Sequence, residues 1–444
     1  MINLYPHQEE FMGAIRKALM THKSIIARAP TGMGKTILAA FIADRTDVLM
    51  TVHRKELLRQ TETVVKGRIC MIQTLTRHDF IPPKVLIVDE AHLSMAKTWQ
   101  SVIRKCLDAG SLVIGLTATP CRLDGRPLGD IYEAIVESKN EQWLINNGYL
   151  SNYTYYVPHI PNMSGARKSK GDYALNDVLT AMNGRVIDDA VGKYKLLASG
   201  KRTITFCASI EHSKQTVEAF KAQSIPAEHI DGTMTDNARR EAIQRFADNG
   251  GIISNVNIMT EGFDLSAQIG RDITVEAVMI LRPTASLALH RQMIGRALRR
   301  KPYPAIIMDF AGNVERHGFP SDAIEWTLKG KSKRLSDAIS IQRCPDCFHV
   351  QKPAPICGAC GYVFTADGKI IDEVAGELCV IDSVEWNRAR RREVDEARTY
   401  PELVKIEKSR HYKVGWAEHQ YKNKYGIQVS GQDTITVRGY SPWW

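Results

Sequence analysis

Residues 29–36 constrain the fold of this chain more than any other segment, because they read APTGMGKT. They follow the short apolar run Ser24–Ala27 and precede a second apolar stretch, so we expect a strand, a tight loop and a helix in succession. Glycines let backbone N–H groups turn inward around phosphate oxygens at the positive end of a helix. The segment therefore predicts a phosphate-binding loop, with Lys35 on the β- and γ-phosphates and Thr36 on Mg²⁺. The general pattern has glycine where this chain has Ala29.

Short apolar, β-branched runs alternate with longer helix-like stretches, and the runs fall into two series. The first series is Ser24–Ala27, Asp47–Met50, Val85–Val88 and Leu112–Leu116. The second series is Thr203–Phe206, Gly251–Ile253, Ala277–Leu281 and Ala305–Met308. Continuous apolar runs of this length are typical of parallel strands buried on both faces. The sequence therefore predicts two α/β units in series.

Two carboxylates, Asp89 and Glu90, come directly after the run Val85–Val88. A carboxylate at the C-terminal end of a buried parallel strand lies beside the crevice in which such sheets bind ligands. We expect Asp89 to hold Mg²⁺ and Glu90 to orient and deprotonate the attacking water. The alternative is that both residues only cap a helix, but the phosphate-binding loop favours the first interpretation.

Further short segments follow in a characteristic order. They are Tyr5–Gln8, Thr51–Arg54, Ile72–Leu75 and Leu116–Pro120 in the first unit, and Phe206–Ser209, Asn255–Asp264 and Gln292–Arg299 in the second. Together with the phosphate-binding loop and the sequence DEAH at 89–92, this order resembles the DEAH-type branch of the superfamily-2 helicases over residues 3–320. Each motif is short, but their order is specific.

The resemblance implies two RecA-like lobes with ATP between them, and it gives each motif a role. The nucleotide-binding residues would be Gln8, Pro30, Thr31, Gly32, Met33, Gly34, Lys35, Thr36 and Asp264, with Gln8 at the adenine edge and Thr36 and Asp89 on Mg²⁺. The catalytic residues would be Lys35, Asp89, Glu90, Gln292, Arg296 and Arg299. The nucleic-acid contacts would be Arg54, Gln73, Thr74, Arg122 and Thr260, and the residues that couple ATP state to lobe closure would be His92, Thr117 and Thr119.

Arg296 and Arg299 are three residues apart, so on a helix they would project from one face. Two guanidinium groups on one face suit a triphosphate whose charge spreads in the transition state. A solvated basic face is the alternative. The neighbouring Gly295 permits close approach, which favours the phosphate interpretation.

Cys344, Cys347, Cys357 and Cys360 form two CxxC pairs separated by nine residues. Four thiolates at this spacing can surround one Zn²⁺ tetrahedrally. The gap is shorter than the roughly 15 to 20 residues of commoner four-cysteine fingers, so we expect a small structural zinc ribbon. Disulfides or free thiols are the alternative, and His349 is a possible substitute ligand.

The C-terminal tail mixes cations with aromatic residues. They include Arg388, Arg390, Arg391, Arg392, Lys405, Lys408, Arg410, Lys413, Lys422 and Lys424, with Tyr412, Trp416, Tyr421 and Tyr425. Such a mixture is typical of nucleic-acid surfaces. The alternative is a small helical element that packs Trp416 and Tyr421 inward. Arg122 and Arg126 could likewise line the strand groove or lie on an exposed loop.

Lysine and arginine outnumber aspartate and glutamate by 59 to 49, which gives a formal net charge of +10. This excess favours polyanionic partners, although a basic surface without a partner would give the same count. No run approaches the roughly 18 apolar residues of a membrane span, and the N-terminal segment lacks the pattern of a signal peptide. The nine cysteines do not form a secreted disulfide pattern, so we expect a cytoplasmic protein.

The expected fold class is α/β, with two tandem RecA-like parallel-sheet lobes, a small zinc ribbon and an α-rich basic tail. The expected boundaries are 1–150 for the first lobe, 151–190 for a linker or insertion, 191–330 for the second lobe, 335–370 for the ribbon and 371–444 for the tail.

The expected function is an ATP-dependent DNA helicase or translocase that requires ATP, Mg²⁺ and Zn²⁺. Compact bacterial and phage helicases, related to restriction-enzyme motor subunits and branch-migrating enzymes, are the most similar group. Partners would be single-stranded, forked or branched DNA, and proteins of replication, recombination or restriction, with no membrane. An RNA helicase, a motor subunit of a restriction-type complex and a DNA-binding scaffold with a decayed ATPase remain open alternatives.

Overall fold

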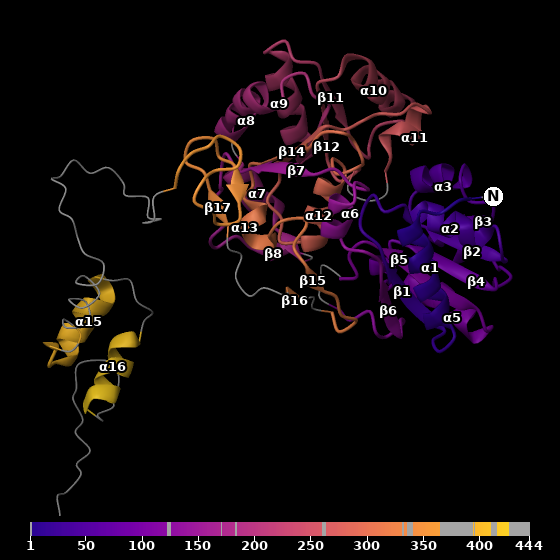
Figure 1. Ribbon diagram of the computed structural model, residues 1–444, viewed down its shortest axis with the longest axis horizontal. Coiled ribbons are helices and arrows are strands. Elements are labelled where there is room, and N and C mark those ends of the chain that lie inside the picture. The colour runs from indigo at the N-terminus through magenta and orange to yellow at the C-terminus, as the bar shows by residue number, and fades with distance from the viewer. Residues whose placement is uncertain are drawn as a thin grey trace, which may run out of the picture. The chain divides into compact units, whose positions relative to one another are not determined.

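The computed structural model describes residues 2–121, 126–169, 171–182, 184–259, 263–330, 333–334, 341–364, 394, 396–409 and 415–425. The chain divides into two compact units, Met1–Asp367 and Gly368–Trp444. The first unit contains both predicted lobes and the cysteine cluster (Figure 1). Within the described residues, no helix is long and apolar enough to cross a membrane.

The first lobe is a six-stranded parallel sheet in the order β3-β2-β4-β5-β1-β6. Its strands are β1 (Ser24–Arg28), β2 (Val48–Val52), β3 (Arg68–Met71), β4 (Val85–Asp89), β5 (Leu112–Thr117) and β6 (Ala134–Glu137). Its helices are α1 (Pro6–Leu19), α2 (Lys35–Ala43), α3 (Lys55–Glu62), α4 (Ile72–Leu75) and α5 (Lys97–Asp108), with the 3₁₀ turn η1 (Ala91–Leu93). Ile25 and Ala27 pack in one apolar cluster and Ile26 in another, because successive strand side chains point to opposite faces.

The second lobe is also a six-stranded parallel sheet, in the order β11-β12-β10-β13-β14-β7. Its strands are β7 (Tyr153–Tyr156), β10 (Thr203–Cys207), β11 (Ala227–Ile230), β12 (Ile252–Asn255), β13 (Ala277–Leu281) and β14 (Ala305–Asp309). Its helices are α7 (Leu175–Ala181), α8 (Gly184–Leu197), α9 (Ile210–Lys221), α10 (Asp236–Asn249), α11 (Leu265–Ile269), α12 (Leu287–Gly295) and α13 (Asn313–His317). The two RecA-like lobes predicted from the sequence are confirmed.

Residues 151–190, which we expected to form a linker or insertion, instead contribute the edge strand β7 to the second sheet. The sequence of β7 is YTYY, and its side chains are mostly half-buried, so it lacks the aliphatic run of a central strand. The same segment carries a short hairpin, β8 (Lys168–Ser169) and β9 (Asp172–Tyr173), ahead of α7.

The chain crosses between the lobes twice within the described residues. The first crossing contains α6 (Glu141–Asn146) and leads from β6 to β7. The second is the segment 319–330, which follows α13 and includes β15 (Ile324–Glu325), paired with β16 (Lys333–Arg334). Leu328 O accepts hydrogen bonds from Leu128 N at 2.9 Å and Gly129 N at 3.1 Å, so this segment is anchored on the first lobe.

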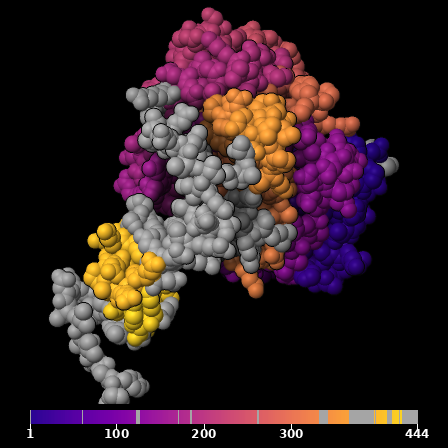
Figure 2. All heavy atoms as spheres, turned by 60° about the vertical axis from the view of Figure 1, so that its left-hand side comes forward, coloured from indigo at the N-terminus to yellow at the C-terminus, as the bar shows by residue number. Residues whose placement is uncertain are grey.

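The cysteine module is built on the antiparallel pair β17 (Gln342–Arg343) and β18 (Val350–Gln351). It attaches to the second lobe beside β7, where Val157 N donates to Phe348 O at 2.9 Å and Arg343 Nη2 donates to Pro158 O at 2.9 Å. Figure 2 shows the module, in orange, against the magenta surface of that lobe.

The part of the second unit that the structure describes includes the helices α15 (Tyr400–Ser409) and α16 (Trp416–Tyr425). Leu403 and Ile406 are buried between them, and Trp416 and Tyr421 pack against this small core. This packing agrees with the helical alternative for the tail. The tail residues Arg388, Arg390, Arg391, Arg392, Arg410, Tyr412 and Lys413 lie outside the described residues.

Candidate functional site

A cavity of about 520 Å³ lies between the lobes. Its walls come from α1, the loop after β1 and the end of β4 in the first lobe, and from α12 and the residues around it in the second. The sequence-predicted residues that line it are Gln8, Thr31, Gly32, Met33, Gly34, Lys35, Thr36, Asp89, Glu90, Asp264, Gln292, Arg296 and Arg299. Residues more than 250 positions apart in the chain thus meet in one cleft.

The loop between β1 and α2 has the geometry expected of a phosphate-binding loop. Gly32 and Gly34 have φ values of +88° and +93°, which other residues rarely adopt. A Cβ atom on Gly34 would also lie 2.8 Å from Gln8 Nε2. Lys35 Nζ donates only to Ala29 O, at 3.3 Å, among the hydrogen bonds of the described residues. Desolvation lowers the pKa of Lys35, although Glu90 and Asp89 act to raise it.

Asp89 and Glu90 lie side by side at the end of β4. Glu90 N donates to Asp89 Oδ1 at 3.0 Å, and Glu90 adopts a left-handed backbone with φ of 49°. Strain of this kind in a non-glycine residue is common at functional sites. Burial, and then the neighbouring Glu90, raise the pKa of Asp89 to about 6. Two carboxylates crowded in a buried part of the cavity, which Thr36 also lines, fit a divalent cation because oxygen ligands of negative charge suit Mg²⁺.

Gln8 is hydrogen-bonded to two segments of the first lobe. Its Nε2 donates to Met33 O at 2.8 Å, and its Oε1 accepts from Tyr5 N at 2.9 Å. Tyr5 and Tyr149 also line the cavity, with ring centroids 5.3 Å apart. Tyr5 belongs to the motif segment Tyr5–Gln8 but had no role assigned to it, and Tyr149 was not predicted because a single aromatic residue carries no motif.

The two arginines of the second lobe lie in the cleft, but not on one helix. Helix α12 ends at Gly295, and Arg299 forms an isolated bridge with Leu150, so the expectation of a shared helix face is wrong. The helix does not continue to Arg299 because the residues after Gly295 pair with the segment that crosses between the lobes. Ser151 N of this segment donates to Leu298 O at 2.9 Å.

Arg296 is buried and Arg299 is half-exposed. Arg296 Nη1 donates to Phe263 O at 2.7 Å, while its buried Nε has no hydrogen-bond partner among the described residues. Burial, with Arg299 nearby, lowers the pKa of Arg296 to about 10. Arg299 Nη1 lies 2.9 Å from Asp264 Oδ2. The cleft therefore contains one incompletely satisfied guanidinium and one held by a carboxylate.

The predicted coupling residues do not line the cavity, but His92 contacts Glu90, which does. His92 Nδ1 is 3.3 Å from Thr117 Oγ1 and 3.4 Å from Glu90 Oε2, and Thr119 N donates to Thr117 Oγ1 at 3.2 Å. These contacts connect the end of β4 to the end of β5. Pro30 is part of the loop but does not line the cavity.

Among the predicted nucleic-acid residues that the structure describes, Arg54, Gln73 and Thr74 do not line the cavity. Arg54 Nη1 donates to Asn257 O at 3.3 Å, across the two lobes, and Gln73 Nε2 donates to His53 O at 3.5 Å. Gln73 and Thr74 are exposed. Arg122 and Thr260 lie outside the described residues.

Ser213, His229 and Asp231 are connected in the second lobe in the order of a catalytic triad. Ser213 Oγ lies 2.7 Å from His229 Nδ1, and His229 Nε2 lies 2.7 Å from Asp231 Oδ2. Ser213 is fully buried and also contacts Ser254 Oγ at 2.6 Å. No substrate can reach this hydroxyl, so the cluster holds β11 and β12 against α9.

The sulfur atoms of Cys344, Cys347, Cys357 and Cys360 all lie within 4.8 Å of one another. The Cys344–Cys360 and Cys347–Cys357 separations are 3.6 and 3.7 Å, far beyond a disulfide bond. Four sulfurs placed about 2.3 Å from a tetrahedral Zn²⁺ would be roughly 3.8 Å apart, so the cluster fits this ion. His349 does not join it, because its Nδ1 lies 3.1 Å from Tyr155 O.

Two family models match the chain. The model described as the res subunit of type III restriction enzymes matches residues 1–71 and 69–122, and the helicase conserved C-terminal domain matches residues 187–301. Apart from Leu144 and Tyr149, the residues that line the cavity lie within these matched segments.

Relatives with similar sequences include a phage protein and a yeast protein. A 51.5 kDa protein of a Lactococcus phage is 31% identical over 369 residues, which cover 77% of this chain and 78% of the phage protein. A Saccharomyces cerevisiae protein provisionally named ATP-dependent helicase IRC3 is 24% identical over 66% of this chain, but the match covers only 42% of the yeast protein. Among solved structures, the ATP-dependent Type ISP restriction-modification enzyme LlaBIII bound to DNA has a TM-score of 0.48 and 18% identity, over 69% of this chain and 27% of that one.

Proposed function

The chain belongs to the superfamily-2 helicases, which are ATP-dependent nucleic-acid motors, and we propose that it uses ATP hydrolysis between its lobes to move along or unwind DNA. The observation that carries the proposal is the shared cavity, in which Lys35 and Glu90 of one lobe face Arg296 and Arg299 of the other. A site divided in this way is complete only while the lobes are close together. ATP binding would therefore favour closure, and hydrolysis would favour opening.

Each cleft residue has a role consistent with its position. Lys35 would bind the β- and γ-phosphates, and Glu90 would accept a proton from the attacking water. Thr36 and Asp89 would hold Mg²⁺, which neutralises phosphate charge when bound. Arg296, with its unpartnered Nε, would bind the charge that develops on the transferring phosphate.

Arg299 would reach the same phosphate after leaving Asp264. The Arg299 side chain is 47% exposed, so it is free to change rotamer at little cost. A triphosphate carries more negative charge than one carboxylate and competes with Asp264 for the guanidinium. Tyr5 and Tyr149 present aromatic rings to the cavity and would contact the base, beside Gln8.

DNA is the proposed polymer. The formal net charge of +10 supports a phosphate-backbone partner without distinguishing DNA from RNA. The match to a restriction-enzyme subunit over the first lobe favours DNA, since restriction enzymes cleave it. The same match supports a second candidate, a motor subunit whose nuclease is a separate chain.

The polymer is tested by measuring ATP hydrolysis without nucleic acid and with single-stranded, duplex, forked or four-way-junction DNA, or RNA of matched length. Glu90→Gln provides the inactive control for each substrate. Stimulation by DNA well above that by RNA supports the proposal, and a preference for junctions would extend it to branch migration. Stimulation mainly by RNA would overturn the DNA assignment.

We also propose that the four cysteines hold one structural Zn²⁺, because the protein fills all four positions and leaves none for catalysis. Phe348 lies within the module, and its carbonyl oxygen accepts a hydrogen bond from Val157 N, next to β7. The ion would therefore fix the conformation of the loop that covers this edge of the sheet. Metal analysis of freshly purified protein tests this, and absence of zinc would overturn it.

A further inference from the structure

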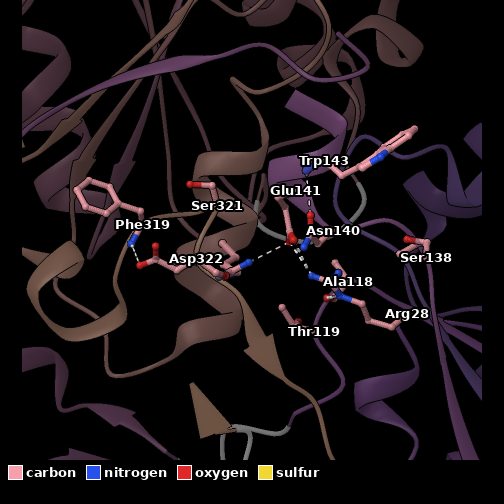
Figure 3. Close-up of polar contacts among 12 residues, drawn as sticks. Arg28, Ala118, Thr119, Ser138, Asn140, Glu141, Trp143, Phe319, Ser321 and Asp322 are labelled. Carbon is pink, nitrogen blue, oxygen red and sulfur yellow. Dashed lines mark hydrogen bonds and ion pairs between the residues drawn. The ribbon is translucent and has the colours of Figure 1, made fainter. Parts of the chain in front are cut away.

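A largely buried carboxylate, Glu141, connects the two lobes outside the cavity. It is the first residue of α6, on the crossing segment, and Asn140 caps that helix by accepting from Trp143 N at 2.9 Å. Glu141 accepts two hydrogen bonds from Arg28 Nη2, at 2.7 Å to Oε1 and 2.9 Å to Oε2. The same Oε1 accepts from Arg291 Nη1 of the second lobe, at 3.0 Å. Figure 3 shows Arg28 and Glu141 pointing toward each other.

Both arginines are fixed by further contacts. Arg28 Nε donates to Ala118 O at 3.1 Å, and its guanidinium lies 5.4 Å from the Trp326 ring. Arg291 Nη2 donates to Asp322 O at 2.8 Å. Trp326 and Asp322 both belong to the segment 319–330, so the second crossing also converges on this cluster.

The side chains of this cluster are almost completely shielded from solvent. The side chains of Arg28, Glu141 and Arg291 are 2%, 12% and 6% exposed. Burial alone would raise the pKa of Glu141, but Arg28 and Arg291 outweigh it and hold this pKa below its ordinary value. Separating a buried pair leaves uncompensated charge and costs far more than breaking a surface pair. Separating the lobes at this cluster would therefore be costly.

Each arginine lies next to a residue of the ATP site. Arg28 directly precedes Ala29, the first residue of the phosphate-binding loop. Its Nε also donates to the carbonyl oxygen of Ala118, the residue between Thr117 and Thr119. Arg291 directly precedes Gln292 and lies on α12, whose C-terminal end carries Arg296. One carboxylate thus connects the loop that is proposed to bind phosphate to the helix that ends just before Arg296.

We propose that Glu141 is a positioning residue for ATP hydrolysis, at the fixed pivot about which the lobes close. This inference rests on the proposed function. Glu141 does not line the cavity, and it acts through Arg28 and Arg291 by setting the distance between the two halves of the site. A misplacement of about 1 Å at such a site costs on the order of 100-fold in rate.

The test is steady-state ATP hydrolysis by full-length Glu141→Gln, with saturating DNA and without it. We expect the stimulated kcat to fall about tenfold or more while KM for ATP stays within about threefold, because the pivot affects alignment rather than nucleotide contacts. Glu141→Asp keeps the charge and should restore part of the loss. Glu228→Gln is the matched control, because it breaks an arginine–carboxylate pair with Arg245 that lies outside the cleft.

A double-mutant cycle tests whether the carboxylate acts as a bridge. Arg291→Met removes only the hydrogen bond that connects the second lobe to Glu141. The double variant Glu141→Gln/Arg291→Met should hydrolyse ATP no more slowly than the slower single variant, because both substitutions remove the same connection between the lobes. Losses that multiply would overturn the inference. So would a Glu141→Gln protein that melts at lower temperature but has the wild-type kcat per folded molecule.

The two proposals fail in different ways. Wild-type protein without polymer-stimulated ATP hydrolysis would contradict the proposed function itself. Stimulated wild-type hydrolysis with an unimpaired Glu141→Gln variant would leave that function standing and overturn the pivot alone.

Discussion

Gly295 of the second lobe lies directly against Thr31 of the phosphate-binding loop, so closely that a Cβ atom on Gly295 would be 2.7 Å from Thr31 Cβ. The last residue of α12 and the loop of the opposite lobe are therefore in contact. Close approach is the reason for glycine here, because no positive φ requires it. The contact sets how near Arg296 can come to the phosphates.

Gly295→Ala should wedge the lobes apart and lower kcat about tenfold, because the added methyl group must displace Thr31. Steady-state ATP hydrolysis measures the effect. Gly192→Ala, also in a helix of the second lobe but with open space around its Cβ position, is the control and should leave kcat unchanged. Equal activity of both variants would show that the contact has no role in closure.

Lys35→Ala should reduce ATP turnover about 100-fold or more, because the variant loses the cation that faces the transferring phosphate. The side chain makes only one weak hydrogen bond within the described residues, so the fold should survive its removal. Lys17→Ala, on the exposed face of α1, serves as control. Near-normal turnover by Lys35→Ala would refute the site.

The strands that sequence patterns predicted and those they missed differ by position in the sheet. The eight predicted runs are β1, β2, β4 and β5 and β10, β12, β13 and β14, the central strands of both sheets. The four strands of these two sheets that were missed, β3, β6, β7 and β11, are the edge strands of the two sheets. Central strands are buried on both faces and need aliphatic runs. Edge strands such as β7 are half-exposed and carry a mixed pattern that resembles a loop.

The site divides in a similar way. Lys35, Glu90 and Arg296 belong to local motifs in which chemistry dictates the spacing, so the sequence predicted that they would share a site. Glu141 belongs to no such motif, because its partners Arg28 and Arg291 are 113 and 150 residues away. Only the packing of two crossing segments against both lobes brings the three together, and no pattern in one sequence encodes that distance.

Arg299→Ala should bind ATP with near-normal affinity but hydrolyse it about 1,000-fold more slowly, because an arginine that reaches across to a phosphate acts mainly in the transition state. In this structure Arg299 is paired with Asp264. Asp264→Asn should weaken that pair while leaving the guanidinium present, so its kcat should fall much less. Nucleotide binding by fluorescence and turnover by phosphate release separate the two effects. Arg240→Ala, exposed on α10, is the control, and retained turnover by Arg299→Ala would make the assignment wrong.

Cys357→Ser should lose bound zinc and lower the thermal midpoint of the second lobe, because Cys357 is a buried member of the four-sulfur cluster. Wild-type protein should contain roughly one Zn²⁺ per chain. Cys70→Ser, at a half-buried cysteine outside the cluster, should keep both zinc and stability. Zinc retained at the wild-type ratio in Cys357→Ser would contradict the four-cysteine site.

His212 should make the second lobe sensitive to acid. It is 3% exposed at the start of α9, its Nδ1 accepts from Ala208 N at 3.4 Å, and its Nε2 has no partner among the described residues. Burial lowers the pKa of His212 to about 4. The unfolded chain therefore binds this proton near pH 6.5 while the folded chain resists it, and stability falls as the pH drops from 6.5 toward 4. Across that pH range the free energy of unfolding falls by roughly 3 kcal/mol because of this one group, and His212 causes no such loss above pH 7.

Urea unfolding at pH 7.5 and pH 5 measures this loss. His212→Asn keeps an acceptor for Ala208 N but cannot titrate, so it should lower stability at pH 7.5 through lost packing and yet flatten the decline toward pH 5. His78→Asn, at an exposed histidine, should follow the wild-type decline. Removing the titrating imidazole must remove its share of the proton uptake on unfolding. If the stability of His212→Asn falls as steeply toward pH 5 as that of the wild type, the acid sensitivity of this lobe arises from other groups.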